Sequence, residues 1–187
     1  MRAARRQTPA GAGDTEHMED PAGRDETIEV VVEIPKGSRN KYEFDHARHV
    51  IRLDRVLHSS VHYPTDYGFV PDSLAADGDP LDVLVLVDEG TFPGCRLAAR
   101  PIGLLHMADE HGEDVKVLAV LAHDPRYDEV RELTDLAPHW RREVEVFFAT
   151  YKQLEDDKEV TVGGWEGRDA AWRAVAGARQ AFQARAG

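Results

Sequence analysis

The sequence has very little cysteine and no long apolar run. Cys95 is the only cysteine among the 187 residues, so neither an internal disulfide nor a cysteine-rich zinc site can form within the chain. No run approaches the roughly 20 apolar residues that a membrane-spanning helix needs. Residues 1–7 are basic, but no apolar stretch follows them as it would in a secretory signal. These absences predict a cytoplasmic protein without a membrane segment.

Basic charge and aromatic residues are also scarce. Lys and Arg number 23 against 35 Asp and Glu, which gives a formal net charge of −12. A chain of this charge does not attract phosphate backbones or anionic membranes as a whole. Aromatic residues make up only 7%, whereas binders of single-stranded nucleic acid stack bases on aromatic side chains in a basic groove. We therefore expect neither nucleic acid nor a membrane as partner.

Hydrophobic patterning begins only after the first two dozen residues. Residues 1–24 are rich in Ala, Gly, Pro, Asp and Glu and show no apolar period, so we expect a disordered N-terminal tail. Its four basic and four acidic residues cancel, so the net negative charge belongs to the rest of the chain. Residues 25–187 are long enough for a single domain with its own core.

Alternating and buried-type apolar patterns predict mainly strands, with helices late in the chain. An amphipathic stripe predicts a helix over residues 140–151, and an Ala-rich segment predicts a second over 172–182. Residues 58–79 are expected to form a loop. Many short strands followed by helices indicate an α+β domain with an antiparallel sheet or closed barrel. The predicted strands are residues 28–34, 41–45, 50–57, 81–87, 97–107, 115–121 and 158–162.

The most informative segment is residues 77–82, Asp-Gly-Asp-Pro-Leu-Asp, which runs into an apolar strand. Gly78 permits a tight turn and Pro80 restricts the backbone, so the carboxylates of Asp77, Asp79 and Asp82 can converge. Clustered carboxylates supply the oxygen ligands that Mg²⁺ prefers. An ordinary acidic turn is the alternative. A calcium EF-hand is excluded, because its sixth loop position requires glycine and here holds Asp82.

A hairpin tip supplies further acids. Asp109 and Asp114 flank a predicted hairpin loop, and Lys116 shares a strand face with Asp114. A solvated, charged tip would explain this pattern equally well. His106 and His111 lie near the same loop, where they could tune metal choice or serve as ordinary polar residues.

Charged residues also line the early strands and the end of the first helix. Glu33, Lys41, Glu43 and Arg55 lie on early strands, and Lys41 and Glu43 share a face. Cross-strand ion pairs on a wet face are the alternative here. The remaining candidates are tyrosines and a lysine that could bind phosphate oxygens, or could simply pack and cap a helix: Tyr67, Tyr151 and Lys152.

Together these segments resemble the soluble, single-domain (family I) inorganic pyrophosphatases in their bacterial form. The resemblance runs from about residue 28 to about residue 172, and its most specific motif is residues 77–82. Supporting motifs follow in the expected order. They are Glu-Ile-Pro from Glu33, Lys-Tyr-Glu at 41–43, Leu-Asp-Arg at 53–55, Tyr-Pro-Thr-Asp-Tyr-Gly at 63–68, residues 109–116, and Phe-Phe-Ala-Thr-Tyr-Lys at 147–152. Asp157, where a glycine is common, departs from the family pattern.

The resemblance implies a fold, a reaction and roles for individual residues. The fold would be a compact five-stranded antiparallel β-barrel, OB-like, with two flanking α-helices. The reaction would be hydrolysis of pyrophosphate to two orthophosphates with Asp79 as general base. Several Mg²⁺ ions, with Mn²⁺ or Zn²⁺ as substitutes, would be held by Asp77, Asp82, Asp109, Asp114, Glu33 and Glu43. The substrate would be bound by Lys41, Arg55, Tyr67, Lys116, Tyr151 and Lys152, with Asp54 and Lys158 in support.

The site that the resemblance implies carries a net negative charge. Its seven carboxylates outnumber its four Lys and Arg side chains by three, so we expect the empty site to repel a polyanion and to require divalent cations even for binding of pyrophosphate. The resemblance also implies a homo-oligomer, commonly a hexamer. Two alternatives stay open from the residues, namely a metal-dependent hydrolase of nucleoside polyphosphates and a barrel-type nucleic-acid-binding module.

Overall fold

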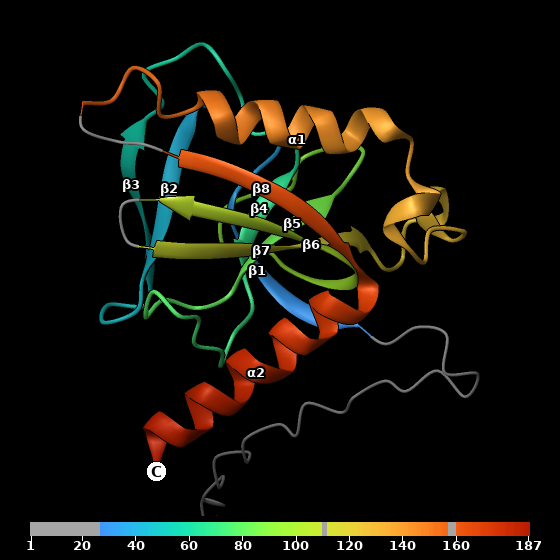
Figure 1. The fold of residues 1–187 in the computed structure, drawn as a ribbon. Coiled ribbons are helices and arrows are strands. Elements are labelled where there is room, and N and C mark those ends of the chain that lie inside the picture. The colour runs from blue at the N-terminus through green and yellow to red at the C-terminus, as the bar shows by residue number, and fades with distance from the viewer. Residues whose placement is uncertain (1–26, 110–111, 157–159) are drawn as a thin grey trace, which may run out of the picture.

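The computed structural model describes residues 27–109, 112–156 and 160–187. The predicted N-terminal tail lies outside these ranges and stays a prediction. Within them the chain forms eight strands, two α-helices and two short 3₁₀ helices (Figure 1). Their bounds are β1 Ile28–Ile34, β2 Asn40–Asp45, β3 Val50–Val56, β4 Asp66–Phe69, β5 Asp82–Leu86, β6 Arg96–Asp109, β7 Gly112–Leu121, η1 Pro125–Tyr127, η2 Leu133–Asp135, α1 Pro138–Thr150, β8 Val160–Gly167 and α2 Arg168–Ala186.

Five strands close into a barrel in the order β1-β4-β5-β7-β6, with β6 pairing back onto β1. The 14-residue β6 makes closure possible, because its first residues pair with β1 while its later residues pair with β8 on the same edge. The register shifts between Pro101 and Gly103, where proline interrupts the ladder and the strand can bend. The predicted five-stranded barrel with two helices is confirmed.

One ladder corrects the expectation of an entirely antiparallel barrel. β5 and β7 pair in parallel, with Asp82 opposite Lys116, whereas the other ladders are antiparallel. A parallel pair needs a long crossover connection. Here β6 serves as that connection, since it forms a hairpin with β7 and thereby turns β7 to run in the same direction as β5.

The strand β4 corrects the prediction of a continuous loop over residues 58–79. It is only four residues long and contains Asp66 and Gly68, which have low β propensity. Gly68 is nevertheless required, because a Cβ atom there would lie 2.0 Å from the backbone oxygen of Val31 on the neighbouring strand. The close approach of β1 and β4 thus depends on a residue that weakens the strand signal in the sequence.

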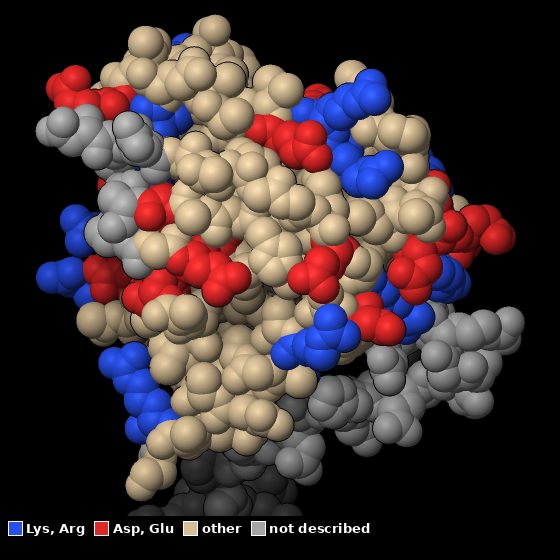
Figure 2. Space-filling model, in the orientation of Figure 1, with Lys and Arg blue, Asp and Glu red and all other residues tan. Residues whose placement is uncertain are grey.

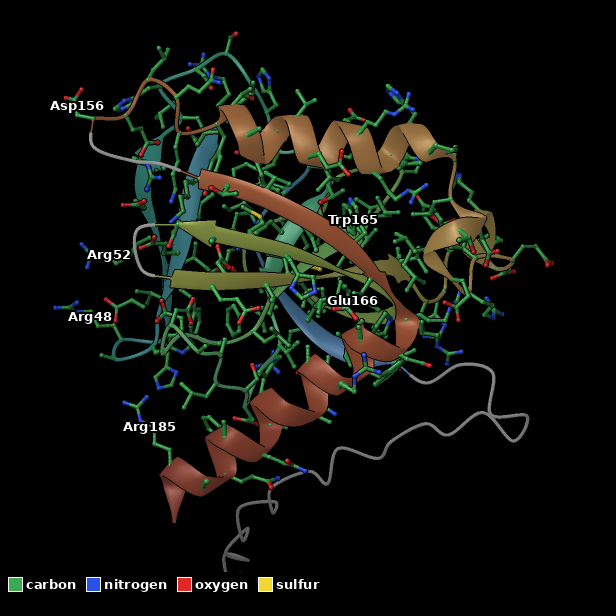
Figure 3. The ribbon with its side chains drawn as sticks, viewed as in Figure 1. Arg48, Arg52, Asp156, Trp165, Glu166 and Arg185 are labelled. Atoms are coloured by element: carbon green, nitrogen blue, oxygen red, sulfur yellow. The ribbon has the colours of Figure 1, made fainter. Side chains whose placement is uncertain are left out.

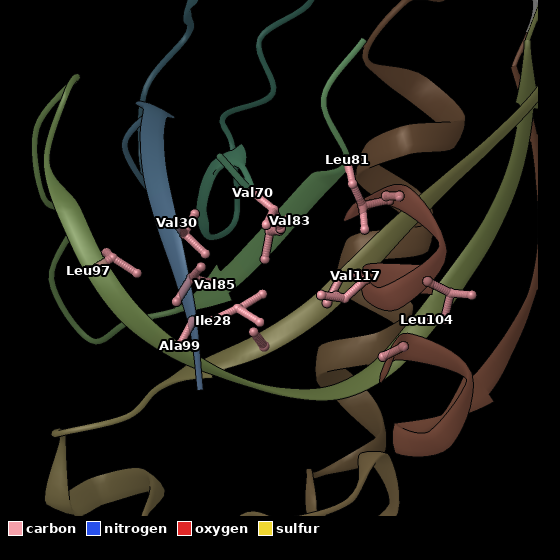
Figure 4. Close-up of a cluster of buried hydrophobic side chains, with 14 of the residues drawn as sticks. Ile28, Val30, Val70, Leu81, Val83, Val85, Leu97, Ala99, Leu104 and Val117 are labelled. Atoms are coloured by element: carbon pink, nitrogen blue, oxygen red, sulfur yellow. The ribbon is translucent and has the colours of Figure 1, made fainter. Parts of the chain in front are cut away.

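The central strand β5 is buried on both faces, as its continuous apolar pattern predicts. Val83 and Val85 belong to a cluster that includes residues of α2, and part of this cluster is shown in Figure 4. Leu84 and Leu86 belong to a second cluster that includes residues of α1. The two helices therefore pack against different sides of the barrel (Figure 1).

Candidate active site

Charged side chains from β5 and β7 meet where the parallel ladder begins. Lys116 lies opposite Asp82 in that ladder, and its Nζ donates to Asp82 Oδ2 at 2.7 Å and to Asp114 Oδ1 at 2.8 Å. The Tyr67 hydroxyl donates to Asp82 and accepts from Lys116 Nζ at 3.2 Å. Burial alone would lower the pKa of Lys116, but Asp82 and Asp114 raise it above its usual value. The ammonium group therefore stays charged and supplies a fixed cation between two carboxylates.

Hydrogen bonds brace the loop before β5, which carries Asp77 and Asp79. Gly78 has φ of +95°, and the Asp79 backbone amide donates to Asp77 Oδ1 at 3.0 Å. The buried Ser73 hydroxyl joins the two ends of the loop, donating to the Val70 oxygen at 2.7 Å and accepting from the Leu81 amide at 2.9 Å. A pocket beside this loop is lined by Ala75, Ala76, Asp77, Asp82, Glu113, Asp114 and Val115.

Asp79 is exposed, and its surroundings make it a better proton acceptor than a free aspartate. Partial burial, followed by the charges of Asp77, Asp82 and Glu43, raises the pKa of Asp79 above its usual value. A carboxylate of raised pKa that water can reach is suited to accept a proton from a nucleophilic water.

Glu33 links β1 to the two-stranded sheet formed by β2 and β3. Its Oε1 accepts a hydrogen bond from the Phe44 amide at 2.7 Å. Burial raises the pKa of Glu33 to about 7, with a smaller contribution in the same direction from Asp82. Burial likewise raises the pKa of Asp114, even though Lys116 opposes the shift. Burial therefore disfavours the charged form of both carboxylates, and nearby acids add to this effect.

The β2–β3 sheet presents two further cations to the site. Lys41 pairs with Glu43, as their shared parity predicts, and its Nζ lies 3.4 Å from Asp54 Oδ2. Arg55 Nη1 donates to Asp54 Oδ2 at 2.5 Å, and Arg55 Nε donates to Glu155 Oε1 at 3.0 Å. The sequence indicated a supporting role for Asp54, but it drew no attention to Glu155.

Two residues that directly follow α1 also belong to the site. Lys152 Nζ donates to Asp109 Oδ2 at 3.2 Å, which joins the turn after α1 to the end of β6. Tyr151 is buried, and its burial raises the pKa of its hydroxyl, which also interacts electrostatically with Lys116, Asp114, Arg55 and Asp109. Hydrogen bonds, ion pairs and longer-range electrostatic interactions together link the predicted catalytic, metal and substrate residues, which come from β1 to β7 and the loop and helix ends beside them.

Comparison with known proteins decides the family. The model of the inorganic pyrophosphatase family matches residues 30–183. The chain belongs to the inorganic pyrophosphatase family. The inorganic pyrophosphatase of Haloferax volcanii is 49% identical over 168 residues, which cover 90% of this chain and 95% of that protein. That of a Nostoc species is 56% identical over 143 residues, which cover 76% and 83%.

Solved structures of the family match both the fold and the sequence. The inorganic pyrophosphatase of Thermus thermophilus superimposes with a TM-score of 0.83 at 43% identity, over 88% of this chain and 95% of that one. That of Helicobacter pylori gives a TM-score of 0.83 at 40% identity, over 86% and 96%. The predicted membership of the pyrophosphatase family, whose members are metal-dependent hydrolases with an OB-like barrel, is thereby confirmed.

Among the other candidate residues near the site, some lie within the described ranges and others lie outside them. His106 lies on β6 with Nε2 2.7 Å from Glu166 Oε1 and Nδ1 3.6 Å from Glu113 Oε1, a residue that lines the pocket. His111 and Lys158 lie outside the described residues, so their predicted roles stay predictions, and Asp157, the departure from the family pattern, lies outside them as well. None of the helices in the described ranges combines the length and apolar character that crossing a membrane requires.

The carboxylate oxygens of the site are suitable ligands for a hard divalent cation, although several of these side chains form ion pairs with lysines. Over the described ranges, no three His, Cys, Asp or Glu side chains stand ready around one metal position. Asp82 and Asp114 form ion pairs with Lys116, and Asp109 forms an ion pair with Lys152. These carboxylates are therefore directed toward lysines and not toward a common metal position. Burial is the main cause of the raised pKa values of Glu33, Asp79 and Asp114, and neighbouring carboxylates add to it. Divalent cations would stabilise the charged form of these carboxylates.

Proposed function

We propose that this chain hydrolyses inorganic pyrophosphate to two orthophosphates, with Mg²⁺ as its cofactor and Mn²⁺ or Zn²⁺ as substitutes. The observation that supports this most directly is the placement of Lys116 between Asp82 and Asp114, next to the loop that carries Asp79. A group of carboxylates interleaved with buried cations suits a substrate that is a polyanion and arrives with metal. Membership of the pyrophosphatase family supports the same reaction.

The metal sites would be formed by acids from five parts of the fold, namely β1, β2, β5 with the loop before it, β6 and β7. Asp77, Asp82 and Asp114 line one pocket, while Asp109 ends β6, Glu33 lies near the end of β1 and Glu43 lies within β2. When bound, divalent cations neutralise phosphoryl oxygens and lower the pKa of water in their coordination shell. Because the acids outnumber the basic side chains of the site, cation binding would also precede tight binding of pyrophosphate.

Asp79 would act as the general base. Its carboxylate is exposed to solvent and its pKa is raised, so it can accept the proton of the water that attacks one phosphorus atom. The hydrogen bond from its own amide to Asp77 Oδ1 holds the loop in place while the proton moves.

The basic and phenolic side chains would hold the two phosphoryl groups. Lys41 lies on β2, Arg55 lies on β3, and Lys152 lies in the turn after α1. Lys116 donates to the Tyr67 hydroxyl, and the Tyr151 hydroxyl interacts electrostatically with Lys116 and Arg55. Charged donors from several elements would fix the substrate and stabilise charge on the phosphoryl oxygens as the bridging bond breaks.

The distribution of surface charge bears on the expected binding partners. On the face seen in Figure 2, acidic side chains are interspersed with basic and uncharged ones, so the described part of that face offers no continuous basic surface for nucleic acid. A cytoplasmic address and a homo-oligomer, with the hexamer as the expected form, complete the proposal.

The substitution Asp79→Asn tests the catalytic role. It keeps the size of the side chain and removes the basic oxygen, so we expect kcat for pyrophosphate to fall by about 10²- to 10⁴-fold. Pyrophosphate and ATP should be compared under Mg²⁺, with released phosphate measured across pH. A wild-type preference for ATP would instead favour a nucleoside polyphosphate hydrolase.

Asp72→Asn is the matched control. Asp72 is exposed on the same connection and has φ of +53°, which asparagine tolerates well. We expect this variant to retain wild-type kcat. If Asp79→Asn retains full activity, Asp79 is not the general base.

A further inference from the structure

We infer that Glu155 is a positioning residue, which fixes the guanidinium group of Arg55 in the orientation that binds a phosphoryl group. This inference rests on the proposed function, since it concerns how the same site recognises pyrophosphate. Glu155 lies in the turn that follows α1, 100 residues along the chain from Arg55.

The contact between the two side chains is direct and nearly dry. Arg55 Nε donates to Glu155 Oε1 at 3.0 Å, and the Glu155 side chain is only 5% exposed. The Arg55 side chain is 21% exposed, so its far end still reaches solvent. Because the Nε–H bond lies in the guanidinium plane, a partner at this atom sets the rotation of the whole group.

A second carboxylate holds the guanidinium from another side. Arg55 Nη1 donates to Asp54 Oδ2 at 2.5 Å. These two hydrogen bonds use two of the five N–H donors of arginine and leave three for other acceptors. A planar group held at two atoms presents its remaining donors in a fixed direction, as bidentate recognition of phosphate requires.

Glu155 also belongs to the turn that carries two other phosphate ligands of the proposed site. Its backbone amide donates to the Lys152 oxygen at 2.9 Å, and Lys152 directly follows Tyr151. The same turn meets the segment after β3 a second time, where His58 Nδ1 lies 3.2 Å from the Leu154 oxygen. Glu155 therefore couples the position of Arg55 on β3 to the positions of Tyr151 and Lys152.

A purely structural ion pair would behave differently from a positioning pair. Loss of a structural pair lowers the free energy of unfolding and leaves the kinetic constants of the folded molecules unchanged. Loss of a positioning pair weakens pyrophosphate recognition in molecules that remain folded, and only while Arg55 is present. A double-mutant cycle separates the two cases.

The experiment measures kcat and KM for pyrophosphate under saturating Mg²⁺ for wild type, Glu155→Gln, Arg55→Ala and the double variant. Glu155→Gln keeps an oxygen acceptor but removes the charge, so we expect kcat/KM to fall about 10-fold, chiefly through a higher KM. In the Arg55→Ala background the same substitution should change kcat/KM by less than about 2-fold, because the group it positions is gone.

Asp156→Asn serves as the matched control. It removes one negative charge from the adjacent, exposed residue, whose side chain points away from the protein in Figure 3. We expect its kinetic constants to equal those of wild type. If Glu155→Gln does not fold, Glu155→Asp takes its place in the cycle, since it keeps the charge but withdraws it by one methylene.

The outcomes separate this inference from the proposed function. Wild-type enzyme without pyrophosphatase activity would refute the proposed function and the inference together. Active wild type with an unchanged Glu155→Gln variant would refute the inference alone. Equal losses in the presence and absence of Arg55 would also refute it, because Glu155 would then act independently of the guanidinium.

Discussion

Glu33 should make the metal-free protein less stable as pH rises. Burial raises its pKa to about 7, from an ordinary value of 4.5. Between these values the folded chain retains a proton that the unfolded chain has released. The unfolded state then binds fewer protons than the folded state, so the free energy of unfolding falls with increasing pH. The loss begins near pH 4.5 and is complete above pH 7.

The substitution Glu33→Gln removes this titration while keeping an oxygen that can accept the Phe44 amide. One pKa unit corresponds to about 1.4 kcal/mol, so the full penalty in wild type is about 3 kcal/mol. Between pH 5 and pH 8 the variant should therefore gain about 2.5 kcal/mol relative to wild type. For a chain of this size that difference corresponds to a shift of about 5–10 °C in Tm.

The assay is urea unfolding of both proteins at pH 5 and pH 8 in the presence of chelator, at equal protein concentration. Other titrating groups are common to both proteins and cancel in the difference. Adding Mg²⁺ at pH 8 should reverse the order, because a cation held by the Glu33 carboxylate stabilises the folded state and an amide holds it more weakly. The reasoning is refuted if the difference in stability between the proteins is the same at both pH values.

Two further predictions concern stability. Lys116→Met should lower the free energy of unfolding of metal-free protein by about 3–5 kcal/mol, because it leaves Asp82 and Asp114 without their shared cation; urea unfolding with chelator would contradict this if the variant matched wild type. Gly68→Ala should cost about 3 kcal/mol or more, since its Cβ would meet the Val31 oxygen at 2.0 Å. Calorimetry of both glycine variants and wild type checks this, and the control Gly164→Ala, with no neighbour within 4 Å of the added Cβ, should melt within a few degrees of wild type.

Local patterns in the sequence were sufficient to predict most elements and the acidic loop. The alternation of β1, the continuous apolar run of β5 and the stripe of α1 each reflect burial of one or both faces of a single element. Residues 77–82 likewise bring their acids together through the backbone restrictions of Gly78 and Pro80. Such signals depend on neighbours a few residues away, so they can be read without knowing the fold.

The sequence did not predict β4 or the far half of β8, because the strand signal of both is weak. β4 is short and contains the glycine that its neighbour demands. The far half of β8 is similarly hidden by Gly163 and Gly164, and Gly163 lies close to His106 on the adjacent strand. In both strands the close packing that requires glycine also removes the side chains that would have revealed the strand.

By itself, the sequence determined the family, the barrel with two helices and the residue types of the site. The tertiary structure decided which charges meet. The parallel register of β5 and β7 places Lys116 opposite Asp82, whereas the sequence linked Lys116 only to Asp114. The turn after α1 brings Glu155 to Arg55 across 100 residues. Pairings of this kind depend on strand order and chain crossings, and no local pattern of residues records them.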